Sequence, residues 1–343
     1  MSTLARQEEA VPQAAHASHS ALPERVTVAL SAAIFAMRED EPMVATMPAR
    51  SERVGDGALP CGPFSPREHA TLEAGLASCV ASQTGISLGT ARQLCTIGDR
   101  LRPTAATAPA SIAVCYLALV APGQCTEQGS AAWRSWYAYL PWEDWRHGKP
   151  DCLTQEIEPR LKAWARGASP PCAALAPHEL RDRSQRVRIA FGLEGAAWDE
   201  EKVLERYELL CEAGLYGSAA GTGCVSVLTR LPKLQHPLSG DHGRLLANAI
   251  GELRRSIKRQ PAVFELMADT FTLFELQKTV EAILGPHLHK QNFRRLVEAG
   301  GLVAPTGQHR LRTGGRPARL YRFRPDVLLE RLAPGVRVKS GRT

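Results

Sequence analysis

Hydrophobic and polar positions in the first half of the chain follow strand and helix periods in turn, which predicts a mixed α/β domain. Apolar residues recur four, seven and eight positions after Leu72, so one face of a helix over 69–84 is apolar, and Gly85 ends it. Four apolar runs have strand character, and the helix lies between the second and the third. These runs are 25–37, 42–47, 92–97 and 111–120. Strands on both sides of a helix favour an α/β sandwich.

The middle of the chain, residues 151–238, follows no single period and is expected to be an inserted helical and irregular region. Pro170-Pro171 and the Gly- and Ala-rich stretch 217–223 interrupt it. One helix is well marked there by an apolar stripe from Val203 to Cys211. Four tryptophans between 133 and 145 fit either stacking on a base or core packing, and core packing is favoured because aromatic residues chiefly supply buried area.

The last third of the chain predicts a helix-turn-helix. A helix over Asp241–Arg259 leads into it. The next helix begins after Thr272, a good N-cap, and Glu275 three residues later completes a capping box. Gly285-Pro286 stops this helix, and a second short helix over Lys290–Ala299 follows.

A basic hairpin follows the second short helix. Leu302-Val303 starts one strand, residues 307–318 form a Gly- and Arg-rich loop, and Arg319–Arg324 forms the return strand. In the return strand Tyr321 and Phe323 share one face and arginines occupy the other. Helix, turn, helix and hairpin together predict a winged helix, whose second helix suits the major groove of DNA.

Positive charge is concentrated at the same end. The whole chain carries +7, but residues 286–343 hold thirteen cations and three carboxylates, a net +10, so the remainder is mildly acidic. Most of these cations are arginines on one predicted helix and one loop, which favours double-stranded DNA as partner over a merely solvated surface. The expected DNA-binding residues are Thr272, Lys290, Gln291, Asn292, Arg294, Arg295, Arg312, Arg316, Arg319 and Arg322.

Other classes of protein are disfavoured. The longest apolar run, 26–37, is too short to cross a bilayer, and the glutamates before it do not suit a signal peptide, so a cytoplasmic location without a membrane partner is expected. The nine cysteines are scattered without a CxxC pair. This pattern predicts reduced, mostly buried thiols and no metal site.

Several segments resemble one known family, the Nudix-related transcriptional regulators of NAD metabolism. Its C-terminal domain is matched by the sequences at 271–277, 283–285, 290–295 and 315–323. Residues 59–62 and 83–86 look like the start and end of a Nudix box. The region 151–238 is not part of the common family pattern, and the long form looks like the alphaproteobacterial branch.

The Nudix-like box lacks the acids that the hydrolases of this fold use. Aligned on Gly85, the three later glutamate positions hold Cys79, Ser82 and Gln83, and Glu68 matches only the early glutamate. Thiol, hydroxyl and amide groups do not supply the negative charge that magnesium requires. The sequence therefore predicts no catalytic residues, with a Nudix-type pyrophosphate hydrolase, similar to ADP-ribose pyrophosphatase, as the alternative.

The resemblance implies a dimeric repressor of genes for NAD synthesis, salvage or uptake, released from operator DNA by a nucleotide effector such as ADP-ribose or NAD. Gly62 and Glu68 are the expected ligand-binding residues, and no cofactor is expected. The expected fold is a Nudix-like α/β/α sandwich followed by a winged helix-turn-helix domain. The expected segments are a flexible tail (1–22), a degenerate Nudix-like sensor domain (23–150), the insert (151–238), a linker helix (239–260), the winged helix domain (261–335) and a basic tail (336–343).

Overall fold

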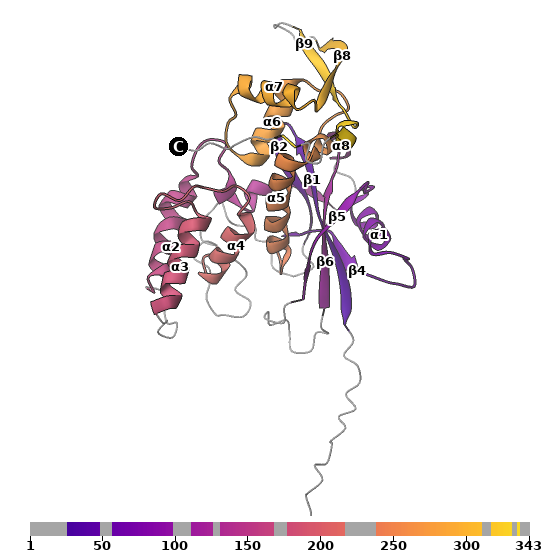
Figure 1. The fold of residues 1–343 in the computed structure, drawn as a ribbon. Helices are drawn as coiled ribbons and strands as arrows, with labels where there is room; N and C mark the ends of the chain where they lie inside the picture. Colours follow the sequence, from indigo (N-terminus) through magenta and orange to yellow (C-terminus); the bar gives the residue numbers. More distant parts are fainter. Residues whose placement is uncertain are drawn as a thin grey trace, which may run out of the picture.

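The computed structural model shows a central sheet, a helical segment beside it and a small domain at one end (Figure 1). It describes residues 26–48, 57–98, 111–125, 131–167, 177–216, 238–310, 317–330 and 335–336. The expected tail at 1–22 and most of the expected basic tail lie outside these residues. Val336 is described, and it is buried, with its N–H bonded to the Ile257 carbonyl at 2.9 Å. Within the described ranges, no helix is long and apolar enough to span a membrane.

The sheet is mixed, and the four strands expected from the apolar runs are confirmed. Its order is β3-β2-β1-β6-β5, with β4 also paired to β1 and β7 to β2. β1 and β6 run parallel from the pair Thr27–Ser111 to the pair Phe35–Leu119, and the other strand pairs are antiparallel. The bounds are β1 Thr27–Arg38, β2 Glu41–Pro48, β3 Gly57–Ala58, β4 Cys61–Pro63, β5 Ala91–Ile97, β6 Ser111–Leu119 and β7 Ala132–Ser135.

Helices cover both faces of the sheet, which gives the expected α/β/α sandwich. α1 (Leu72–Thr84) packs on one face, where Ile34 is buried, and α5 (His242–Arg259) packs on the other, where Phe35 is buried. Alternate residues of β1 therefore enter opposite cores. This explains why the strand reads as one continuous apolar run instead of an alternating one.

α1 begins later than its periodicity suggested. The Thr71 side chain accepts a hydrogen bond from the Ala74 N–H at 3.1 Å, so the helix starts at Leu72 and not at His69. Gly85 ends it with a φ of 72°, a left-handed conformation that glycine adopts without steric cost.

α5 is a layer of the sandwich and not only a linker. It contacts β1, β5 and β6, and its apolar face is buried in the same core as Leu117. At its N-terminus the Leu59 N–H donates to Nδ1 of His242 at 2.7 Å. Burial lowers the pKa of His242, although Asp241 opposes the shift, and a neutral imidazole is the form that can accept this bond.

The inserted region is more helical than the sequence suggested. Leu153–Ile157 forms a π-helical turn that continues into α2 (Glu158–Ala165), and α3 (Pro177–Ala190) precedes α4 (Val203–Glu212). Only α4 was marked in the sequence, because α3 is mostly polar and α2 carries a proline in its first turn. Next to this region, Trp136 and Trp142 are buried, and the preference for core packing is confirmed.

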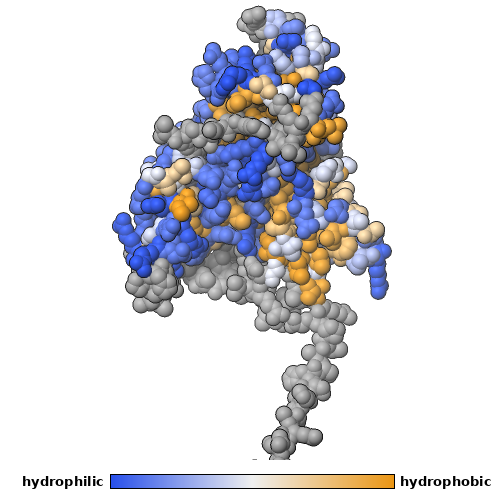
Figure 2. Space-filling model, in the orientation of Figure 1, coloured by the Kyte–Doolittle hydropathy of each residue, from blue (hydrophilic) through white to orange (hydrophobic). Residues whose placement is uncertain are grey.

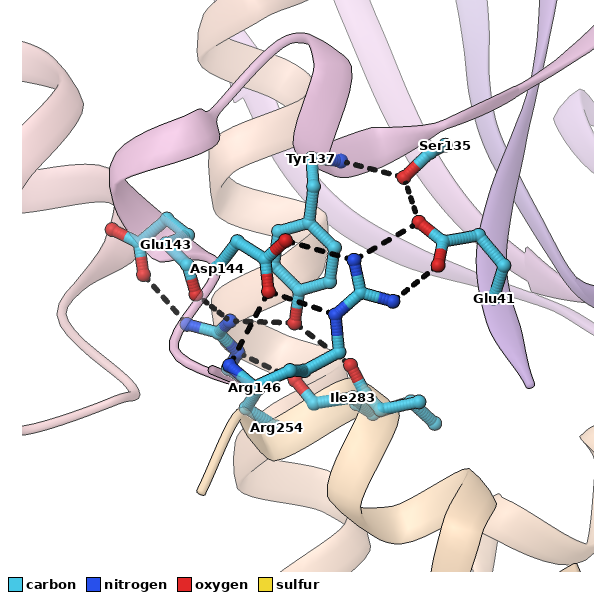
Figure 3. Close-up of polar contacts among 9 residues, drawn as sticks. Glu41, Ser135, Tyr137, Glu143, Asp144, Arg146, Arg254 and Ile283 are labelled. Atoms are coloured by element: carbon cyan, nitrogen blue, oxygen red, sulfur yellow. Dashed lines mark hydrogen bonds and ion pairs between the residues drawn. The ribbon is translucent and has the colours of Figure 1, made fainter. Parts of the chain in front are cut away.

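A buried ion-pair cluster joins the 3-10 turn after β7 (Pro141–Glu143), the insert and α5. Figure 3 shows its contact between Glu143 and Arg254. Glu143 is fully buried and accepts from Nε and Nη2 of Arg206 at 2.6 and 2.9 Å. Nη1 of Arg254 donates to the same carboxylate at 2.6 Å. Arg206 lies on α4 and Arg254 on α5, so one carboxylate compensates two buried cations from different parts of the chain.

The cluster extends into the small C-terminal domain. Nε of Arg254 donates to the carbonyl of Ile283 at 2.9 Å, and the Tyr137 hydroxyl donates to the carbonyl of Ala282 at 2.7 Å (Figure 3). Both carbonyls belong to the last turn of α6 (Leu273–Leu284), where a helix has no partner of its own for its carbonyls. The end of α6 is thereby fixed to the larger part of the molecule.

Arg146 stabilises the position of Tyr137 through contacts that include Glu41 of β2. It forms ion pairs with Asp144, at 2.8 Å, and with Glu41. Its guanidinium lies over the Tyr137 ring, 4.6 Å from the centroid. These contacts hold the ring whose hydroxyl bonds to α6.

We expect Glu143→Gln to lower the free energy of unfolding by about 3–5 kcal/mol, because it leaves two buried guanidinium groups without a counter-charge. Denaturant titration measures this loss. The exposed pair of Arg186 and Glu212, at 2.7 Å, provides the control: Arg186→Ala should cost about 0–1 kcal/mol. Equal losses in the two variants would contradict a special role for the buried pair.

Acid should weaken the same interaction. Burial alone raises the pKa of Glu143, but Arg206 and Arg254 outweigh it, so its pKa in the folded protein lies below 4.5. A carboxylate with a lowered pKa stabilises the fold above its unfolded-state value and loses this contribution as the pH falls. The stability difference between wild type and Glu143→Gln should therefore shrink below about pH 4.5 in denaturant titrations at a series of pH values.

Candidate DNA-binding and effector sites

The small C-terminal domain has the helix, helix and hairpin order that the sequence predicts. α6 is followed by α7 (Lys290–Ala299) and by the antiparallel strands β8 (Val303–Arg310) and β9 (Ala318–Phe323) (Figure 1). β8 is longer than expected, since residues 307–310 belong to the strand and not to the loop. The tip of the hairpin, 311–316, lies outside the described residues.

α6 begins with the expected capping box. The Thr272 N–H donates to Glu275 at 2.8 Å, and the Glu275 N–H donates to the Thr272 hydroxyl at 3.2 Å. Thr272 is only 8% exposed, so its side chain has a capping role and little surface left for DNA. Its expected role in DNA binding stays a prediction.

The outer face of α7 is polar and cationic. Phe293 and Val297 are buried beneath it, which fixes how the helix is turned. Hydrophilic residues cover its outer side (Figure 2). The exposed residues are Lys290, Gln291, Asn292, Arg294, Arg295, Glu298 and Ala299, so three cations stand against one carboxylate.

Two of these groups are already linked in a way that suits recognition. Nη2 of Arg295 donates to Oδ1 of Asn292 at 3.0 Å, across one turn of the helix. Arg side chains bind guanine edges or phosphate, and Asn pairs with adenine. The exposed face can therefore both read bases and hold the backbone.

The hairpin adds further cations. Arg319 and Arg322 are exposed on β9, while Phe323 stacks on Phe264 with ring centroids 4.5 Å apart. Arg312 and Arg316 lie outside the described residues. The sequence reasoning left out Arg310, which is exposed on β8 and forms an ion pair with Glu275; its place in the arginine-rich stretch was the signal for it.

The Nudix-like box is held by neutral side chains. Nε2 of Gln83 donates to the Cys61 carbonyl at 2.7 Å and to the Cys79 sulfur at 3.3 Å, and Oε1 accepts from the Cys61 N–H at 3.3 Å. The Ser82 hydroxyl donates to the Cys79 carbonyl at 2.8 Å. These residues stand where magnesium ligands would have to be, and their chemistry does not fit a hard divalent cation. In the described part of the chain no group of three or more His, Cys, Asp or Glu residues could hold a metal ion.

Gly62 lies on β4, and Glu68 lies in the turn before α1. A Cβ at Gly62 would lie 2.6 Å from the Cys79 sulfur, so the glycine lets β4 approach α1. Glu68 is exposed. Their expected role in binding a nucleotide stays a prediction.

The charged residues of the buried cluster were missed by the sequence reasoning. A signal was present: Arg254 lies one helical turn from both Ile250 and Ile257, and Arg206 one turn from Val203. A cation within an apolar stripe needs a buried partner. Its identity as Glu143 was not readable, because the two are 111 residues apart.

We expect Gly62→Ala to destabilise the fold by about 1–3 kcal/mol, because the added methyl group would overlap the Cys79 sulfur. Removing that sulfur in the double variant Gly62→Ala/Cys79→Ala should restore part of the loss. A double-mutant cycle by denaturant titration, with Cys79→Ala alone as the control, measures the coupling. Strict additivity of the two changes would contradict the contact.

Comparison with known proteins identifies the small domain. Residues 263–323 match the NrtR DNA-binding winged helix domain family. Ninety residues are 41% identical to the ADPR-responsive transcriptional repressor NtrR of Acinetobacter baylyi. This match covers 26% of the chain and 36% of the relative, so it spans about a third of the relative's length.

Two solved structures show that the likeness of fold extends over most of the chain. Shewanella oneidensis NrtR in complex with a 27-mer DNA is 20% identical, with a TM-score of 0.52 and coverage of 88% of this chain and 94% of that one. NrtR of the same organism without DNA gives the same identity and TM-score, with coverage of 88% and 95%. The chain thus has the fold of these structures, a Nudix-like α/β/α domain followed by a winged helix domain.

Proposed function

We propose that this protein is a ligand-responsive transcriptional regulator that binds operator DNA through its winged helix domain and acts as a repressor. The observation that carries the proposal is the match of 263–323 to a DNA-binding winged helix family, together with the cationic outer face of α7. Phe293 and Val297 orient this face away from the core. α7 is thus presented as a recognition helix for the major groove, and β8 and β9 as a wing beside it.

The effector is ADP-ribose or NAD, bound by the Nudix-like domain without chemical conversion. The partial relative in A. baylyi is named as responsive to ADPR, and a Nudix domain of S. oneidensis NrtR has been crystallised with ADP ribose. In this chain Gln83 bonds to both Cys61 and Cys79 where catalytic acids would hold magnesium. The domain therefore binds rather than hydrolyses, with Gly62 and Glu68 as the proposed contacts.

The buried cluster provides the physical route between effector and DNA. Tyr137 and Arg254 bind the last carbonyls of α6, and only a short turn separates that end from α7. These contacts therefore transmit a shift of the sheet or of α5 to the recognition helix, whereas a flexible linker would absorb it. The active form is a homodimer, since winged helix and helix-turn-helix regulators read paired half-sites, and the proposed targets are genes of NAD synthesis, salvage or uptake.

The test is a binding assay of the full chain on the promoter DNA of its own operon, with a salt series and with ADP-ribose or NAD added. If about five phosphates are neutralised per protomer, the logarithm of the affinity should fall with that of the salt concentration at a slope of about −4 to −5. ADP-ribose or NAD should weaken the complex. In parallel, ADP-ribose incubated with the protein and magnesium or manganese should remain intact. Binding indifferent to sequence and nucleotide would reject the regulator, and robust turnover would favour the hydrolase.

We expect Arg294→Ala and Arg295→Ala each to cost about 1–3 kcal/mol of operator affinity, because each removes a cation from the outer face of α7. Fluorescence anisotropy with operator DNA measures the loss, and circular dichroism checks the fold. Arg181→Ala on α3, an exposed arginine far from α7 in the sequence, is the matched control and should leave affinity unchanged. Unchanged binding in both α7 variants would mean that α7 is not the recognition helix.

A further inference from the structure

Two cysteines face each other across the strands β5 and β6. Cys95 and Cys115 are direct partners in the antiparallel register. Opposed residues of such a pair have Cα atoms roughly 4.5–5.5 Å apart, within the range of roughly 4.4–6.8 Å that a disulfide spans. Both thiols are free in the structure.

A bulge in β5 turns Cys95 toward its partner. The register shifts between Gln93 and Cys95, and both Leu94 and Cys95 then pack against the core beneath α5. In a regular strand these neighbours would point to opposite faces. Cys115 is buried in the same core, so the two sulfurs lie on one side of the sheet.

The surroundings give the two thiols different pKa values and different exposure to solvent. The Cys115 thiol donates to the Ala113 carbonyl at 3.8 Å. The side-chain interaction with Cys115 favours the charged form of Cys95, and Asn248 and Arg244 of α5 act in the same direction. Together they outweigh burial and lower the pKa of Cys95 to about 6, whereas the bond to Cys95 and burial raise the pKa of Cys115. Cys95 is half-buried and Cys115 is 1% exposed. A small reagent therefore meets Cys95 first, with a thiol directly behind it.

We propose that Cys95 and Cys115 form a reversible thiol–disulfide pair that takes two-electron oxidants of the peroxide class. The Cys95 thiolate attacks one oxygen of hydrogen peroxide, the O–O bond breaks, and the leaving hydroxide takes up a proton as water, which leaves a sulfenic acid on Cys95. The Cys115 sulfur attacks this sulfur, and the displaced hydroxide leaves as a second water with the Cys115 proton. Two thiols lose two electrons and two protons, and the peroxide is reduced to two waters.

The disulfide changes what α5 faces. Arg244 and Asn248 lie beside an anionic sulfur in the reduced form and beside a neutral disulfide in the oxidised form. Arg244 also bonds to Glu208 of α4 at 2.9 Å. This inference does not depend on the proposed function.

The experiment uses the full chain, reduced and then exposed to equimolar hydrogen peroxide, blocked with N-ethylmaleimide and digested without reductant for mass spectrometry. The expected product is a peptide pair joined through Cys95 and Cys115 that forms before any other disulfide among the nine cysteines and disappears with dithiothreitol. The reaction should be about tenfold slower at pH 5 than at pH 8, because Cys95 is mostly protonated below its pKa of about 6.

Two variants sharpen the result. In Cys115→Ser, the sulfenic acid on Cys95 has no resolving thiol and should be trapped by dimedone, which should label wild type far less. Cys211→Ser, on α4, is the matched control and should keep the 95–115 link. Cys95 linked to another cysteine, Cys95 overoxidised in wild type without a link, or no dimedone adduct in Cys115→Ser would each overturn the proposal.

Discussion

The carboxylate of Glu143 is shared by two buried arginines, and the relative placement of all parts of this molecule depends on that sharing. Arg206 belongs to the insert and Arg254 to the helix that covers the sheet. Neither cation could be buried without the carboxylate, because the desolvation of an unpaired charge costs several kcal/mol. The insert, the sheet domain and α5 must therefore meet at one point.

The same cluster determines how the DNA-binding domain is held. Arg254 and Tyr137 bind the last carbonyls of α6, which would otherwise lack partners in a dry interface. The winged helix domain is thus attached through α6, the helix that precedes α7, and not only by the chain connection. If the protein acts as proposed, these packed, hydrogen-bonded contacts transmit small displacements of the sheet domain.

The Nudix-like box is held together by contacts between neutral side chains. Gln83 occupies its hydrogen bonds on Cys61 and Cys79, and Gly62 lets the strand approach the helix until it touches the Cys79 sulfur. Neutral groups that satisfy one another's hydrogen bonds need no metal to stay in contact. What a hydrolase would keep as a charged, open cleft is here a closed contact between β4 and α1.

The sequence by itself determined the local elements and the charge. The four longest strands of the sheet, the capping box of α6, the cations of α7 and the lack of acids in the box follow from period, capping chemistry and residue type, which act over a few positions. The tertiary structure alone decided that α5 is a layer of the sandwich, that Thr272 is only 8% exposed, that the insert is largely helical, and that Glu143 pairs with Arg206 and Arg254. These features depend on contacts between residues up to 111 positions apart, and a local pattern carries no information about which distant group completes a buried pair.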